Sequence, residues 1–169
     1  MRRPGVVFAA TIALVLLADQ LTKAAVRSAI PFGRSIPILG GLAFLTHAEN
    51  TGGAFSILAG TPWLFVAVSS TLIVAALVWF VVKRPTDPLL VLGLGLLIGG
   101  AAGNLVDRVA FGYVIDFLDV QIWPIFNVAD SGVVVGTGLI VLASVLADLR
   151  ANRDSHGSDG ADNSPTRAD

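Results

Sequence analysis

Long apolar runs alternate with short polar segments along the chain, and four of the runs approach the length of a membrane-spanning helix. A helix rises 1.5 Å per residue, so about 20 residues cross the ~30 Å hydrocarbon layer. We therefore predict spanning helices at Val6–Val26, Pro62–Val82, Pro88–Val106 and Ser131–Asp148. The chain is 54% hydrophobic and 14% charged, which argues against an ordinary soluble core. The fold class we expect is an all-α membrane protein whose residues 1–149 form one four-helix domain.

The beginning of the chain has two interpretations. Two arginines followed by an apolar stretch are also typical of a secretory signal. Here the run continues through "ADQLTKAAV", which is longer than a usual signal core, so we favour a retained first helix.

Lysine and arginine near the helix ends indicate the orientation in the membrane. They precede the first helix, occupy the connection between the second and third, and follow the fourth: Arg2, Arg3, Lys83, Arg84, Arg150 and Arg153. We expect these segments and both termini to be cytoplasmic, and segments 27–61 and 107–130 to face outward. Arg27, Arg34 and Arg108 in the outer segments make this contrast imperfect.

The first outer segment differs from the final segment in its pattern. "PFGRSIPILGGLAFLTHAENTGGAFSI" is rich in Gly and Pro with short apolar pieces, which predicts strands and turns in a small β-like extracytoplasmic cap. Residues 150–169 are polar without apolar periodicity and predict a disordered cytoplasmic tail.

Polar residues of three predicted helices fall at one depth. Asp19 lies about 20 Å along the first helix from its cytoplasmic start, and Asn104 about 24 Å along the third. Asp130 stands where the fourth helix re-enters from outside. Ionisable residues inside a membrane are costly and usually face a protein interior or a watery cavity, so this outer layer is a candidate functional site.

Two spacings within the helices suggest specific contacts. Asp19 and Lys23 are four residues apart and can pair on one helix face, either as a salt bridge alone or as part of a site. Gly95, Gly99 and Gly103 repeat every four residues, which favours close approach of another helix.

The sequence also allows specific interpretations of five further polar residues. Asn104 and Arg108 lie one turn apart on one face, suited to holding a carboxylate or a substrate carbonyl, and Asp107 is a candidate partner for Arg108. Asn50 precedes two glycines, which indicates either a turn or an amide offered to an extended peptide backbone. His47 has no second ligand nearby, so we do not expect it to bind a metal.

The stretch "IDFLDVQIWPIFNVADSG" brings three aspartates to the membrane surface. Asp130, before an apolar run, is a natural helix N-cap, and Asp116 and Asp119 can be ordinary loop carboxylates. Alternatively, two carboxylates delivered by a loop and a helix start can share one proton and activate water for peptide hydrolysis. A helix N-terminus favours the ionised form of Asp130, which leaves the proton on Asp116. The spacing alone does not choose between Asp116 and Asp119.

Other chemistries find little support in the sequence. There is no cysteine, no H-E-x-x-H pattern for zinc and no glycine-framed nucleophilic serine. A serine–lysine dyad would have to use Lys23, which Asp19 already pairs. The net charge of −1 without a basic stripe gives no indication of a nucleic-acid partner. The rival interpretations are a proton- or ion-coupled transport subunit and a non-catalytic assembly factor.

Five blocks in order, "DQLTK", "ENTGGAF", "GGAAGNLVDR", "VIDF" and "FNVAD", resemble the signature blocks of the lipoprotein signal peptidases, the bacterial signal peptidase II family. The resemblance implies a metal-free, cofactor-free aspartyl protease of the bacterial inner membrane. It implies that the protein removes signal peptides from diacylglyceryl-modified prolipoproteins, cutting just before the lipidated cysteine. The family's catalytic aspartates match Asp116 and Asp130 and leave out Asp119. Its supporting or site-lining residues match Asp19, Lys23, Asn50, Gly100, Asn104, Arg108 and Asn127.

The resemblance also indicates how substrate would approach. A diacylglyceryl anchor confines its substrate to the membrane surface, so the cleavage site should lie at headgroup depth. The helices should form a lateral groove for the signal helix, over which the Gly-rich outer segment closes. Gly53, where the family often has alanine, affects only local loop flexibility. Trp63 and Trp123 are expected to be interfacial anchors, and membrane lipids and prolipoproteins the partners.

Overall fold

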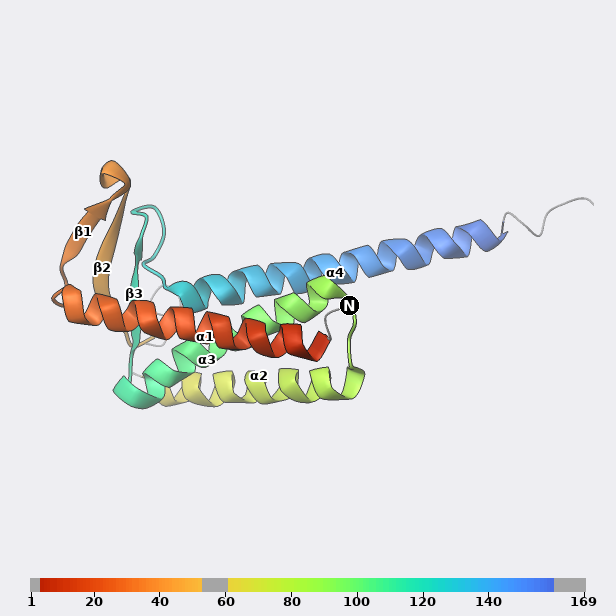
Figure 1. The fold of residues 1–169 in the computed structure, drawn as a ribbon, viewed down its shortest axis with the longest axis horizontal. Helices are drawn as coiled ribbons and strands as arrows, with labels where there is room; N and C mark the ends of the chain where they lie inside the picture. The colour runs from red at the N-terminus through yellow and green to blue at the C-terminus, as the bar shows by residue number, and fades with distance from the viewer. Residues whose placement is uncertain (1–3, 53–60, 160–169) are drawn as a thin grey trace, which may run out of the picture.

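The computed structural model describes residues 4–52 and 61–159, which form a bundle of four helices with a small sheet at one end (Figure 1). The helices are α1 (Pro4–Ala29), α2 (Pro62–Lys83), α3 (Pro88–Phe111) and α4 (Val128–Asp159). Each contains a stretch long and apolar enough to cross a membrane, so the prediction of four spanning helices is confirmed. Strands β1 (Ser35–Ile38) and β2 (Ala43–Asn50), joined by the 3-10 turn η1 (Leu39–Gly41), and strand β3 (Val114–Asp119) form the sheet.

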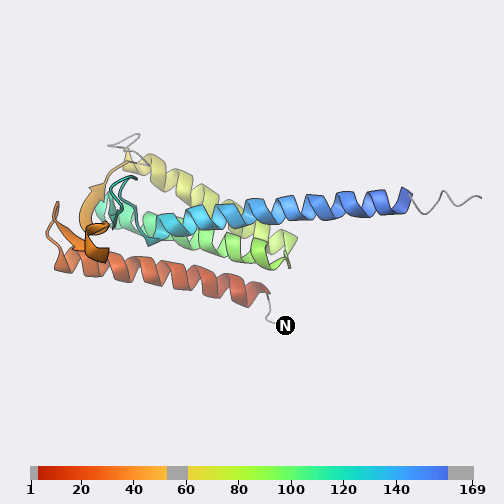
Figure 2. The same ribbon diagram turned by 90° about the horizontal axis from the view of Figure 1, so that it is seen from above.

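Helix α3 is the centre of the bundle. Half of its most apolar window is buried inside the protein, whereas none of that of α2 is. At the sheet end, α1 and α2 lie on opposite sides of α3 and α4 (Figure 2). At the other end α1 and α2 approach each other, because Phe8 and Phe80 stack with their ring centroids 3.7 Å apart. Helix α3 therefore contacts each of the other three helices.

Glycines allow the close helix contacts that the four-residue spacing predicted. A Cβ added at Gly95 would lie 2.8 Å from Cβ of Thr11 in α1, and one at Gly99 would lie 2.9 Å from Cβ of Val15. Gly103, the third glycine of the series, faces the side chain of Asp19, which also belongs to α1. The predicted packing of this stripe against another helix is confirmed, and the partner is α1.

Helix α3 is longer than its apolar run. It begins after Asp87, whose carboxylate accepts the N–H groups of Leu89 and Leu90 at 2.9 and 3.0 Å. It ends at Gly112, which adopts the left-handed conformation with φ 81°. The sequence predicted a loop from residue 107, but residues 107–111 are still part of α3. Asp107 and Arg108 are helical because their side chains find partners inside the protein, so the loss of apolar character does not end the helix.

The start of α4 also differs from the prediction. The cap is Asn127, whose Oδ1 accepts the N–H of Asp130 at 2.8 Å, while Oδ2 of Asp130 accepts the N–H of Asn127 at 3.2 Å. This reciprocal arrangement is a capping box, and it places Asp130 at the third helical position. The prediction of Asp130 as the N-cap is wrong. The cap is Asn127, three residues earlier, whose side chain accepts the N–H of Asp130.

Helix α4 continues past the end of its apolar run. It reaches Asp159, ten residues beyond the boundary at residue 149 that the sequence suggested. Residues 150–159 are therefore helical and not part of a disordered tail. Helical backbone groups bond within the helix itself, so a polar composition without a strong breaker does not require the helix to stop. Residues 160–169 of the predicted tail lie outside the described residues.

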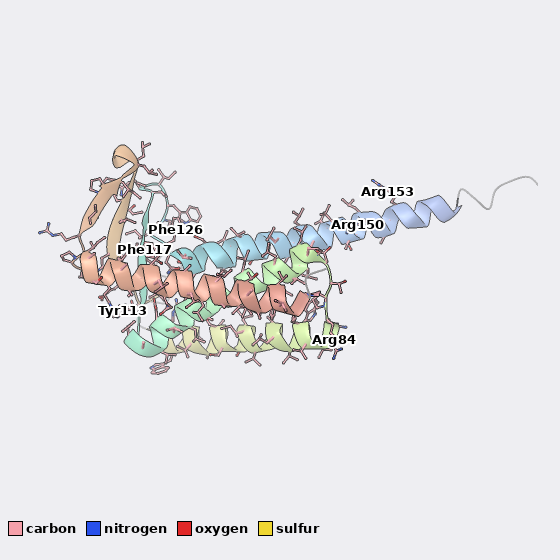
Figure 3. The ribbon with its side chains drawn as sticks, viewed as in Figure 1. Arg84, Tyr113, Phe117, Phe126, Arg150 and Arg153 are labelled. Carbon is pink, nitrogen blue, oxygen red and sulfur yellow. The ribbon has the colours of Figure 1, made fainter. Side chains whose placement is uncertain are left out.

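The sheet has the order β1-β2-β3, and both pairings are antiparallel. Strands β1 and β2 confirm the expected β-like cap. Strand β3 was not predicted, and it places Asp116 on a strand opposite Ala48 instead of in a loop. The chain then turns back so that Phe126 exchanges hydrogen bonds with Leu118 at 2.7 and 3.1 Å. This return brings the start of α4 beside β3; Phe117 and Phe126 are labelled there in Figure 3.

Candidate active site

Asp116 of β3 and Asp130 of α4 face one cavity of about 230 Å³ between the sheet, α3 and the loop that joins β3 to α4. Asn127 connects them. Its Nδ2 donates to Oδ1 of Asp116 at 2.7 Å, and its backbone N–H donates to Oδ2 of Asp130 at 3.2 Å. Two carboxyl groups fourteen residues apart in the chain are therefore held by a single asparagine.

The sheet register positions Asn50 next to Asp116. Ala48 lies opposite Asp116, and Asn50, two residues further along β2, projects from the same face. Nδ2 of Asn50 donates to Oδ2 of Asp116 at 3.0 Å, while its Oδ1 accepts the N–H of Gly52 at 3.0 Å. The turn interpretation of Asn50 is confirmed by its oxygen, whereas its amide nitrogen binds Asp116, and a contact of this amide with a peptide backbone stays a prediction. Gly53 lies outside the described residues.

The environment of Asp116 opposes its ionisation. Burial raises the pKa of Asp116 from 3.8 to about 7, and the negative charge of Asp130 adds to the rise. Hydrogen bonds from Asn50 and Asn127 favour the ionised form and limit the shift. At a pH below about 7, Asp116 is the member of the pair that holds a proton.

Asp130 has donors suited to a negative charge. Nδ2 of Asn104 donates to its Oδ1 at 2.7 Å, and Asn127 donates to its Oδ2. It also lies in the first turn of α4, where the helix dipole favours an anion. The two carboxyl groups thus have different surroundings, one buried beside a negative charge and one at the start of a helix with two N–H donors.

Arg108 lies at the same cavity and on the same face of α3 as Asn104, as the spacing predicted. Its Nη2 donates to the carbonyl oxygen of Gly52 at 3.1 Å, and its guanidinium lies 4.9 Å from the ring centroid of Phe65. Its Nε is buried, and within residues 4–52 and 61–159 it has no hydrogen-bond partner.

Behind the cavity, Lys23 is buried with only 2% of its surface exposed. Its Nζ lies 2.8 Å from Oδ2 of Asp19 and 2.9 Å from Oδ2 of Asp107, and it donates to Oδ1 of Asn104 at 3.0 Å. The predicted Asp19–Lys23 pair is confirmed. Lys23 does not extend to the surface, because three acceptors hold it inside. Asp107 pairs with Lys23 and not, as considered, with Arg108.

Gln20 is one residue of this region that was missed in the sequence. Gln20 donates from Nε2 to Oδ1 of Asp107 at 3.0 Å and to the carbonyl oxygen of Gly103 at 3.2 Å. The signal available was its place beside Asp19 in "DQLTK". Gly100, matched to the family's site, has no polar side chain to offer. It packs against the carbonyl oxygen of Ala129, where a Cβ has no room, so it allows the first turn of α4 to approach α3.

Asp119 and His47 lie apart from the pair. Oδ2 of Asp119 accepts from Thr46 at 3.0 Å, so this carboxylate is engaged within the sheet. Nδ1 of His47 donates to the carbonyl oxygen of Ile30 at 2.7 Å, which links β2 to the end of α1. In the part of the chain that the structure describes, no three His, Cys, Asp or Glu side chains are grouped so that they could hold a metal ion.

A larger cavity of about 490 Å³ lies between α2, α3 and α4 and is lined mainly by apolar side chains. Asn104, Arg108 and Asp130 line both this groove and the smaller cavity. The expected lateral groove is therefore present, and it ends at the carboxyl pair. Trp123 lines the smaller cavity, while Trp63 is 72% exposed on α2.

The fold and the site together define a multi-pass membrane protein with an asymmetric carboxyl pair at one end of a helical bundle, which is the arrangement of an aspartic-type membrane protease. Comparison with known proteins gives the family. The family model described as signal peptidase (SPase) II matches residues 11–146, and the chain belongs to the signal peptidase II family of bacterial aspartic proteases.

Individual relatives agree with this assignment. The chain is similar to the lipoprotein signal peptidase of Pelotomaculum thermopropionicum, with 48% identity over 132 residues, 78% of this chain and 87% of the relative. The lipoprotein signal peptidase of Halothermothrix orenii is 43% identical over 76% of this chain and 88% of its own length. These matches identify the chain as a member by similarity along most of its length, and they give no support to the transport alternative.

Solved structures agree in fold. A bacterial membrane enzyme structure determined by the in meso method at 2.3 Å resolution has a TM-score of 0.78 and 26% identity, over 96% of this chain and 94% of that chain. A second, at 1.9 Å resolution, has a TM-score of 0.74 and 31% identity, over 80% and 90% of the two chains.

Proposed function

We propose that this protein removes signal peptides from diacylglyceryl-modified prolipoproteins by hydrolysing the peptide bond just before the lipidated cysteine, with Asp116 and Asp130 as its catalytic pair. One observation carries the proposal. Asn127 joins the carboxyl group of Asp116, whose burial favours its protonated form, to the carboxyl group of Asp130, at the end of an apolar groove.

The unequal surroundings of the two aspartates suggest their roles. Ionised Asp130 takes a proton from a water molecule, whose oxygen attacks the scissile carbonyl carbon. Asp116 gives its proton to the carbonyl oxygen, which forms a tetrahedral diol. When this intermediate collapses, the carbon–nitrogen bond breaks, Asp130 gives the proton it took from water to the leaving nitrogen, and Asp116 takes back a proton from one hydroxyl of the diol. The products are the signal peptide with a new carboxyl end and the lipidated cysteine with a free amino group.

Other residues hold the pair and the substrate. Asn50, Asn104 and Asn127 donate to the two carboxyl groups and fix their orientation. Arg108, which lines both cavities, is suited to a carbonyl oxygen of the substrate backbone. The remaining members of the proposed site, Asp19, Lys23 and Gly100, support α4 from behind.

The groove suits a signal peptide bound from the side. Its lining is mostly apolar and lies between three spanning helices, so an apolar helix can occupy it without leaving the membrane. Relatives of this chain carry the name lipoprotein signal peptidase, which points to a lipid-anchored substrate. A lipid anchor would hold the scissile bond at the depth where the groove ends.

The orientation we propose places the sheet on the outer side of the bacterial inner membrane and both termini in the cytoplasm. Arg84, Arg150 and Arg153 lie at the end of the bundle away from the sheet (Figure 3). Positive residues near helix ends favour the cytoplasmic side. Two arginines at the sheet end have aromatic partners, since Arg27 lies 4.5 Å from the ring centroid of Phe111 and Arg108 lies over Phe65.

A gel-shift assay with a purified lipid-modified prolipoprotein tests this function. Wild-type protein in liposomes should convert the precursor to a smaller product, and the unmodified precursor should remain uncut. Cleavage of both precursors at the same rate would contradict the proposed substrate class. Proton flux across the liposome membrane without cleavage would contradict a peptidase function altogether.

A further inference from the structure

A buried cluster of three charged side chains lies directly behind the proposed catalytic pair. Lys23 of α1 pairs with Asp19 of the same helix and with Asp107 of α3, at 2.8 and 2.9 Å. The three residues are 2%, 0% and 1% exposed. Replacing such a buried ion cluster with apolar side chains is often neutral or stabilising, so stability alone does not account for it.

Each carboxylate of the cluster also holds one backbone N–H group. Oδ1 of Asp19 accepts the N–H of Ala129 at 2.9 Å, and Oδ2 of Asp107 accepts the N–H of Ile115 at 3.0 Å. Ala129 and Ile115 are the residues that immediately precede the two proposed catalytic aspartates. Both backbone segments are therefore tied to the single ammonium group of Lys23.

Two amide side chains complete the connection. Nε2 of Gln20 donates to Oδ1 of Asp107 at 3.0 Å and to Oδ2 of Asp19 at 3.2 Å, which links the two carboxylates directly. Asn104 accepts from Lys23 with its Oδ1 and donates to Asp130 with its Nδ2, at 3.0 and 2.7 Å. The Lys23 ammonium thus also orients the Asn104 amide, so that its Nδ2 faces the catalytic pair.

We propose that the Asp19–Lys23–Asp107 cluster sets the separation of the two catalytic carboxyl groups by anchoring the backbone one residue before each, and that Asp107 is a positioning residue of the reaction. The proposal rests on the peptidase function proposed above. Two carboxyl groups share a proton only while they are close, and a displacement of about 1 Å can cost about 100-fold in rate. Asp107 does not line the cavity, so it acts through its partners Ile115, Lys23 and Gln20.

Variants of Asp107 test this role against a matched control at the other end of α3. Asp107→Ala removes the acceptor of the Ile115 N–H, and kcat should fall about 100-fold with little change in KM. Asp107→Asn keeps one oxygen for this N–H, and its loss should be smaller. The control is Asp87→Ala, which also removes a carboxylate that accepts backbone N–H groups of α3 but lies far from the cavity. It should keep the wild-type kcat.

The pH profile separates positioning from a loss of folded protein. Charged groups that act on Asp116 are Lys23 of α1, Arg108 of α3 and Asp130 of α4, and all three remain in the variants. If the two carboxyl groups move apart, Asp130 raises the proton affinity of Asp116 less, so the alkaline limb of kcat should move to lower pH. A simple decrease in the amount of folded enzyme would scale kcat and leave this limb in place.

The outcomes are distinct. If wild-type protein does not cleave a lipid-modified precursor, the peptidase function itself is wrong. If wild-type cleaves, and the folded Asp107 variants keep the wild-type alkaline limb and KM, the positioning role is overturned, whatever their yield. If Asp107→Ala does not fold, Asp107→Asn decides by the same criterion, and a shifted limb with reduced kcat supports the proposal.

Discussion

Asn127 donates a 2.7 Å hydrogen bond from Nδ2 to Oδ1 of Asp116, and this bond connects the sheet to the first turn of α4. The same side chain accepts the N–H of Asp130 through Oδ1 at 2.8 Å. One asparagine therefore acts both as the helix cap and as the connection between the two carboxyl groups. The position of the catalytic pair depends on how α4 begins.

Replacement of Asn127 should therefore affect stability and activity together. Asn127→Ala removes the cap, which typically costs about 1 kcal/mol of stability, and removes the side-chain hydrogen bond to Asp116. We expect kcat to fall about 100-fold. Ser131→Ala is the control, because Ser131 only donates to the carbonyl oxygen of Asn127. Cleavage assays and thermal unfolding of both variants check this, and equal activity of the two would contradict the role of Asn127.

Replacement by alanine should have different effects on activity and stability at Gly100 of α3 and at Gly138 of α4. Gly100→Ala places a Cβ against the carbonyl oxygen of Ala129, so α4 must move away from α3 and activity should fall at least about tenfold. Gly138→Ala meets nothing within 4 Å and should be neutral or stabilising by up to about 1 kcal/mol. The comparison uses unfolding and cleavage of both variants. It fails if Gly100→Ala is as active as Gly138→Ala.

The activity should decline on the alkaline side of neutrality. Burial raises the pKa of Asp116 to about 7, so the protonated form required to donate to the carbonyl oxygen is lost as the pH rises through this value. We expect kcat to fall about tenfold per pH unit well above pH 7. A stopped cleavage assay in matched buffers measures this profile. A rate that stays constant from pH 4 to 9 would exclude proton sharing.

The same carboxyl should make the fold less stable at high pH. Its pKa is raised in the folded protein relative to the ordinary value of 3.8, so its stabilising contribution is complete below about pH 4 and is lost as the pH rises through about 7. Asp116→Asn removes this dependence. Between pH 5 and pH 8, the melting temperature should fall by several degrees more in wild type than in the variant, at about 2–4 °C per kcal/mol. Parallel curves would count against a raised pKa.

The membrane architecture could be predicted from the sequence because the bilayer imposes one simple requirement. A spanning helix needs about 20 apolar residues, and all four such runs are helices in the structure. The helix ends could not be predicted in this way. Arg108 extends α3 past its apolar run, and Asn127 begins α4 before its run, since side-chain partners and caps determine where a helix ends.

The sequence predicted which residues form the site better than it predicted which of them contact one another. Depth along the helices correctly brought Asp19, Asn104 and Asp130 to one layer, where Asn104 donates to Asp130. Strand β3 was missed, because its register depends on pairing with β2, a segment more than sixty residues away. The partner of Asp107 was also missed, since neighbours in the chain say little about which face of a helix meets a lysine on another helix.

The rate of cleavage by purified Asp116→Asn, Asp130→Asn and the double variant tests the central claim most directly. Both residues belong to one unit that activates one water molecule, so each single variant should lose about 10³-fold or more, and the double variant should be no slower than the slower single one. Matching unfolding curves at low pH would show that all three variants are folded. A folded single variant that keeps the wild-type rate would contradict the claim that the two carboxyl groups perform the reaction together.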